Sequence, residues 1–124
     1  MVRTNRLWTD LWLELASFAV LVASVSLLWR SNLLLFAVAL VECLLALRLW
    51  HSRFDLTILA IIGGLGTLAE VVFVQMGVWR YANPTLLGLP LWFPLAFGTT
   101  GMIGGRLAHT ITALWEALSP EQPA

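Results

Sequence analysis

Four long apolar stretches dominate the sequence, at about residues 8–29, 33–50, 56–79 and 89–114. Each is close to the roughly 20 residues that an α-helix needs to cross the hydrocarbon core of a bilayer. Hydrophobic residues make up 60% of the chain and charged residues only 11%, whereas a soluble domain carries about 25% charged residues. The sequence therefore predicts an all-α fold, a single four-helix transmembrane bundle with short loops, followed by a polar tail at about 117–124.

Tryptophans and arginines indicate how such a bundle lies in the membrane. Most tryptophans fall within about a turn of an expected helix end, which is typical of a membrane interface: Trp8, Trp29, Trp50, Trp79, Trp92 and Trp115. Arginines are more frequent on the side of the two termini than on the opposite side: Arg3, Arg6, Arg48 and Arg53 against Arg30 and Arg80. Because cytoplasmic flanks are enriched in arginine, we expect both termini in the cytoplasm, in a bacterial inner membrane.

Charge and ligand-type residues exclude several classes of function. The formal net charge is zero, so the basic surface of a nucleic-acid-binding protein is not expected. His51 and His109 fall on the same side of the membrane but form no cluster with the single cysteine, Cys43. A metal site is therefore not predicted, and no cofactor is expected.

Ionisable residues inside the apolar stretches are candidate functional groups, because charge is costly in hydrocarbon. Glu14 and Arg106 enter the same layer of the bundle, so we predict an ion pair that fixes helix register. Glu42 lies near the middle of the second stretch. As a neutral carboxyl group it is able to donate a proton to a substrate, or only a hydrogen bond to a neighbouring helix. Both roles remain open.

Glu70 is the strongest candidate acid, because small residues share its side of the third stretch. That side carries Gly63, Gly66, Glu70 and Gly77, and the fourth stretch has a matching stripe at Gly98, Gly101 and Gly105. Small residues allow helices to approach closely, so we expect these two faces to meet. Such faces serve helix packing, and they form a ligand groove only where a polar group faces the gap.

The connection 77–94 is rich in aromatic residues and proline. Pro84, Pro90 and Pro94 restrict its backbone, and Pro94 is expected to kink the opening turns of the fourth helix. One interpretation is a rigid aromatic lid with a binding cavity beneath it, lined by Trp79, Arg80, Tyr81, Asn83 and Trp92. The other is an interfacial hairpin in which Arg80 extends its charge into the headgroup layer.

The order of residues from Glu70 to Pro94 resembles two groups of proteins. The residues that carry the resemblance are Glu70, Gly77, Trp79, Tyr81, Pro84, Gly88, Pro90, Trp92 and Pro94. They are similar to those of small uncharacterised bacterial multi-pass membrane proteins and, more distantly, of membrane carotenoid hydratases. The second resemblance implies an enzyme in which an acid precedes an aromatic turn rich in glycine and proline.

Three classes of function are compatible with these features. The first is a module that binds a lipid or another apolar molecule, or an accessory subunit of a larger membrane complex. The second is an enzyme that acts on an isoprenoid or carotenoid, with Glu70 as the acid. The third is a proton-coupled transporter of a small molecule, acting as a homo-oligomer, with Glu42 or Glu70 as the proton carrier.

Overall fold

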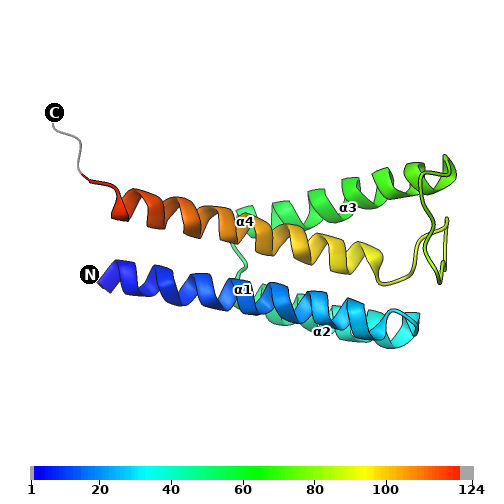
Figure 1. The fold of residues 1–124 in the computed structure, drawn as a ribbon, viewed down its shortest axis with the longest axis horizontal. Coiled ribbons are helices and arrows are strands. Elements are labelled where there is room, and N and C mark those ends of the chain that lie inside the picture. The colour runs from blue at the N-terminus through cyan, green and yellow to red at the C-terminus, as the bar shows by residue number, and fades with distance from the viewer. Residues whose placement is uncertain (1, 121–124) are drawn as a thin grey trace.

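The computed structural model describes residues 2–120 and contains four α-helices. They are α1 (Val2–Leu28), α2 (Asn32–Leu49), α3 (Arg53–Gln75) and α4 (Phe93–Leu118). Figure 1 shows them side by side along one long axis, with consecutive helices antiparallel. The start of α1 and the end of α4 share one end of the bundle, the terminal end. The connection 76–92, which we name the cap, lies at the other end. The predicted all-α helical bundle is confirmed.

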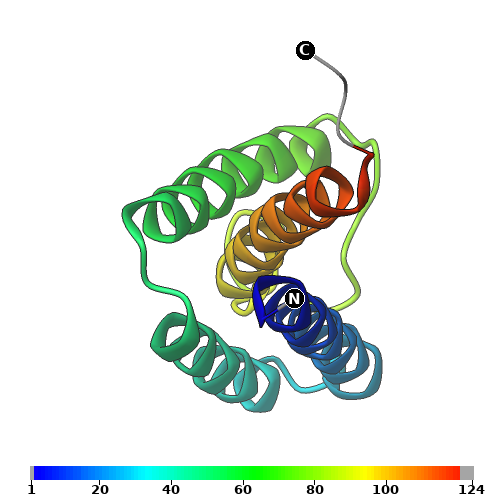
Figure 2. The ribbon, with the colours of Figure 1, turned by 90° about the vertical axis from the view of Figure 1, so that its left-hand side faces the viewer.

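The fourth helix occupies the centre of the bundle. Viewed along the bundle in Figure 2, α4 lies between α3 and α1, and α2 lies beside α1. α4 packs against each of the other three helices, whereas α3 packs mainly against α4. The largest number of buried residues is accordingly found on α4. The bundle therefore consists of a pair α1–α2 and a single helix α3, joined through α4.

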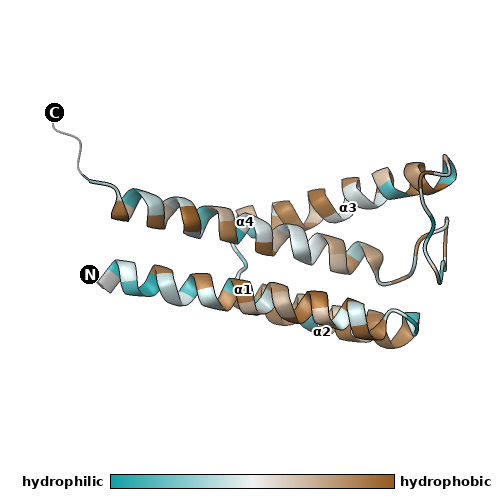
Figure 3. Cartoon of the chain, viewed as in Figure 1, coloured by the Kyte–Doolittle hydropathy of each residue, from teal (hydrophilic) through white to brown (hydrophobic). Residues whose placement is uncertain are grey.

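Within the described residues, three helices are long and apolar enough to cross a membrane: α1 from Arg3, α2 and α3. Figure 3 shows the apolar colour running through them, with hydrophilic residues in the first turns of α1. The fourth helix, α4, which was also expected to span the membrane, contains no stretch as apolar as those of the other three helices. α4 has 26 residues, but glycines, threonines, Arg106 and His109 interrupt its apolar sequence. Because its neighbours enclose it, fewer of its residues need to be compatible with lipid.

Local signals explain where the helices begin and end. α3 begins at Arg53, earlier than expected, because Ser52 and Asp55 form a capping box. It ends at Gln75, and Gly77 follows with a φ of +78°, which glycine adopts without strain. α4 begins at Phe93 rather than at 89. Pro94 lies in its first turn, where proline starts a helix instead of kinking it.

The two glycine faces meet, as predicted, where α3 crosses α4. A Cβ atom added to Gly98 would lie 3.2 Å from the Cα of Gly63 and 3.0 Å from the carbonyl oxygen of Leu59. The backbones therefore touch at this crossing. One turn away along α3, the ring of Phe97 covers Gly66, with a ring carbon 2.0 Å from the position of an added Cβ. The glycines are thus used for packing between α3 and α4.

Candidate functional site

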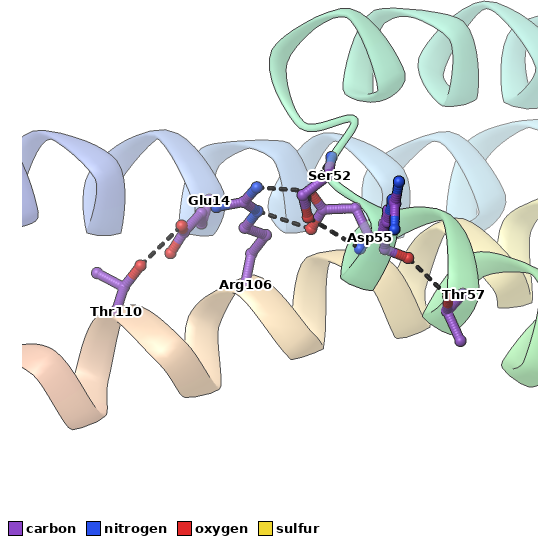
Figure 4. Close-up of polar contacts among 7 residues, drawn as sticks. Glu14, Ser52, Asp55, Thr57, Arg106 and Thr110 are labelled. Carbon is purple, nitrogen blue, oxygen red and sulfur yellow. Dashed lines mark hydrogen bonds and ion pairs between the residues drawn. The ribbon is translucent and has the colours of Figure 1, made fainter.

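Near the middle of α4, beside the start of α3, Arg106 forms an ion pair with Asp55. Its Nε and Nη2 donate to the two carboxylate oxygens at 2.7 and 2.5 Å (Figure 4). The Asp55 side chain is fully buried, whereas 31% of the Arg106 side chain is exposed. The predicted Glu14–Arg106 pair is therefore corrected: in residues 2–120 the guanidinium pairs with the first turn of α3, not with α1. The pair fastens α3 to α4 through a planar, two-bond contact.

Glu14 has another partner. Its Oε1 accepts a hydrogen bond from the hydroxyl of Thr110 at 2.8 Å, and the residue is only 1% exposed. Figure 4 shows the carboxyl group of Glu14 on the side of Arg106 away from Asp55. Glu14 thus connects α1 to α4, and Asp55 connects α3 to α4. Both contacts support the central position of α4.

At the cap end, Glu70 is bonded to the aromatic residues that follow its helix. Its Oε2 accepts hydrogen bonds from the indole Nε1 of Trp79 and from the hydroxyl of Tyr81, both at 2.9 Å. The Tyr81 ring also packs edge-on against Phe93, with a centroid distance of 5.7 Å. The carboxylate serves as an acceptor in both bonds. This geometry anchors the cap to α3.

Further contacts hold the cap to the α1–α2 turn. Asn83 donates to the carbonyl oxygen of Trp29 at 3.0 Å, and Asn32 donates to the carbonyl oxygen of Asn83 at 2.7 Å. Trp92, the last residue of the cap, is buried among apolar residues. Of the five residues predicted to bind a ligand here, Trp79, Arg80 and Tyr81 line a cavity of about 440 Å³. Asn83 and Trp92 instead hold the cap in place.

The titration of Tyr81 tests this anchoring. Burial, with the hydrogen bond and charge of Glu70, raises the pKa of Tyr81 from 10.0 to about 12. Since the folded pKa is above the unfolded one, the stabilisation is complete below pH 10 and is lost as the pH rises towards about 12. Tyr81 is the only tyrosine, so ultraviolet absorbance reports its ionisation directly. We expect Glu70→Gln to lower this pKa while burial keeps it above 10.0. Titration of the unaltered protein near 10.0 would contradict the anchoring.

A second cavity, the lateral pocket, lies beside the middle of α1 and the second half of α2. It has a volume of about 250 Å³ and lining residues from α1, α2 and α4: Ala16, Ser17, Val20, Leu21, Glu42, Leu45, Ala46, Leu49, Thr99 and Ile103. The exposed members of this set belong to α1 and α2, and the α4 members are buried. The pocket therefore opens between α1 and α2, and α4 forms its floor.

The lateral pocket contains two polar groups with unused hydrogen-bonding capacity. Ser24 donates to Oε1 of Glu42 at 2.5 Å, while Oε2 of the same carboxyl group is buried and has no partner among residues 2–120. The hydroxyl oxygen of Thr99 is also buried without a partner, in a residue that is 1% exposed. Buried polar atoms are nearly always hydrogen-bonded. Two such atoms from facing helices, around one pocket, form the polar part of a candidate binding site.

The glycine-lined groove between α2, α3 and α4 is a weaker candidate for a binding site than the lateral pocket. Its volume is about 380 Å³, and Gly63, Gly64, Thr67 and Pro94 are among its lining residues. Glu70 is not among them, so the groove does not bring the expected acid to the expected glycine face. Thr67 contributes one buried hydroxyl without a partner among residues 2–120, and no second such group lines the groove.

Sequence reasoning missed Asp55 and Thr99. Asp55 precedes an apolar stretch two residues after Arg53, where an acidic residue is typical of a helix cap. Thr99 and Thr100 are adjacent in the sequence, but only Thr100 donates to the carbonyl oxygen four residues earlier, at 2.7 Å. A signal for Asp55 was present in the pattern Ser52-x-x-Asp55. For Thr99 the sequence carries no signal.

The chain matches no protein-family model, and no curated protein and no solved structure matches it. The resemblance of residues 70–94 to bacterial multi-pass proteins and to carotenoid hydratases stays a prediction.

Proposed function

We propose that this small membrane protein binds an apolar molecule from the bilayer in the lateral pocket between α1, α2 and α4. The observation that carries the proposal is the pair of buried, unpartnered oxygens, on Glu42 and Thr99, around a pocket with otherwise mainly apolar walls. Binding sites for small molecules have this composition: mostly apolar surface with a few polar groups that orient the ligand.

The position of the pocket supports the entry of a ligand from the hydrocarbon core of the bilayer. Val20, Leu45 and Leu49 line it and are also exposed on the outside of α1 and α2. In a bilayer this surface faces lipid chains, so a molecule dissolved in the hydrocarbon reaches the pocket without crossing water. This exposure supports the proposal of a lipid-binding module, alone or as an accessory subunit.

The isoprenoid enzyme receives less support from the geometry. Its proposed acid, Glu70, accepts two hydrogen bonds that hold the cap, and an acid catalyst needs its carboxyl group directed at the substrate. Proton-coupled transport through Glu42 is compatible with the same pocket, since intramembrane acids serve as proton carriers. That role would add proton exchange to the binding proposed here.

Native mass spectrometry of the protein, extracted in a mild detergent, tests the proposal. We expect the folded protein to retain one apolar molecule per chain, which is released on unfolding. A variable number of bulk phospholipids, lost gradually as collision energy rises, would contradict a defined binding site.

A further inference from the structure

The chemistry of the lateral pocket narrows the class of ligand. This inference rests on the binding function proposed above. We propose that the pocket takes the hydroxyl end of a long-chain alcohol, with Glu42 and Thr99 as its hydrogen-bonding partners.

The hydrogen-bonding groups of the lateral pocket match those of a single hydroxyl group. Within the described part of the chain, Oε2 of Glu42 and the hydroxyl of Thr99 have no partner, while Ser24 is bonded to the other carboxyl oxygen. A ligand hydroxyl has one hydrogen to donate and lone pairs to accept. A single hydroxyl placed between the two oxygens would therefore donate to Glu42 and accept from Thr99. No second polar group on the ligand is required.

Other polar ends fit this pair less well. Ethers, esters and quinone carbonyls only accept hydrogen bonds, so they satisfy Thr99 and leave a carboxylate oxygen of Glu42 unpartnered. A fatty acid would bring a second carboxyl group beside Glu42, and like charges at one site repel. An ammonium group would pair with Glu42, but it has three N–H donors for two unpartnered oxygens and accepts no hydrogen bond from Thr99.

The size of the pocket fits one end of a chain. Its volume of about 250 Å³ is slightly below the usual range of about 300–1,000 Å³ for sites that enclose a whole ligand. The hydroxyl and first carbons fill it, and the rest of the chain follows the exposed surface of Leu45 and Leu49 into the bilayer.

Binding requires a small rearrangement of side chains. The two unpartnered oxygens have almost no exposed surface, although their residues line the pocket. Binding therefore needs the Thr99 and Glu42 side chains to turn their oxygens towards the pocket. Thr99 has no hydrogen bond to break among residues 2–120, whereas the turn of the Glu42 carboxyl group exchanges its bond with Ser24 for the bond with the ligand.

The test compares photoreactive amphiphiles in bilayer nanodiscs. The probes are a hexadecanol with a diazirine in its chain, its methyl ether and the corresponding amine, each at the same mole fraction. Crosslinks are mapped to residues 16–21 and 42–49 by mass spectrometry. In the unaltered protein we expect the alcohol to label these residues about tenfold more than the ether, the difference that roughly one buried hydrogen bond produces.

Variants of Thr99 test whether the preference for the alcohol over the ether comes from the lateral pocket. Thr99→Val keeps the shape but removes the hydroxyl, so the alcohol-to-ether ratio should fall severalfold, whereas Thr99→Ser should retain it. Thr112→Val is the matched control, because Thr112 is exposed on α4 and bonds the carbonyl oxygen of Ala108. Its ratio should not change.

The possible results separate the two proposals. Equal labelling of the pocket by alcohol and ether in the unaltered protein would overturn the alcohol assignment and leave the binding of apolar chains intact. Stronger labelling by the amine, or a preference for alcohol that survives Thr99→Val, would also overturn it. If no probe labels the pocket, both the assignment and the proposed function fail.

Discussion

Gly98→Val is expected to destabilise the bundle by roughly 2–3 kcal/mol, because it inserts a branched side chain between two touching backbones. The first added atom would lie 3.0 Å from the carbonyl oxygen of Leu59 and 3.2 Å from the Cα of Gly63. Backbone atoms of a helix cannot rotate away as a side chain does. α3 must therefore move away from α4, and it has little other packing to retain it. Thermal or SDS-induced unfolding in detergent measures the loss.

Gly104 provides the matched control for this substitution. It lies on the same helix, and a Cβ atom added there would meet nothing within 4 Å. Gly104→Val should leave stability unchanged or slightly increased, since valine is a better helix former than glycine. Equal destabilisation by the two substitutions would show that α3 and α4 do not cross at Gly98.

The sequence predicted the helices well because their apolar stretches are long. The predicted and observed helices differ at their ends, because capping residues and turns, rather than hydropathy, determine those ends. Capping by Ser52 extends α3 towards its start, and the positive φ at Leu87 and Gly88 keeps the preceding loop out of α4. Hydropathy marks the part of a helix that lies in lipid, whereas caps and turns decide where the helix begins and ends.

Partners of polar side chains were harder to predict. The sequence places Glu14 and Arg106 in one layer, but the rotation of α4 directs Arg106 towards Asp55. The proximity of Glu70 to Trp79 and Tyr81 follows from a short separation along the chain, so it could be anticipated. The meeting of Glu42 and Thr99 at one pocket depends on how α2 and α4 pack against each other and against α1. Periodicity along single helices does not contain that information.

Ala16→Trp is expected to abolish retention of the bound molecule. Ala16 is exposed at the mouth of the lateral pocket, so an indole side chain there occupies the volume that the ligand needs. Since the residue is at the surface of the bundle, the substitution should leave the fold intact. Ala23 is exposed on the same helix and does not line the pocket, which makes Ala23→Trp the matched control.

Native mass spectrometry of the three proteins, extracted from the same membranes, tests the central claim most directly. The account predicts one retained apolar molecule per chain in the unaltered protein and in Ala23→Trp, and none in Ala16→Trp. Retention of the same molecule at the same stoichiometry in Ala16→Trp would show that it binds elsewhere, and would contradict the assignment of the lateral pocket as the binding site.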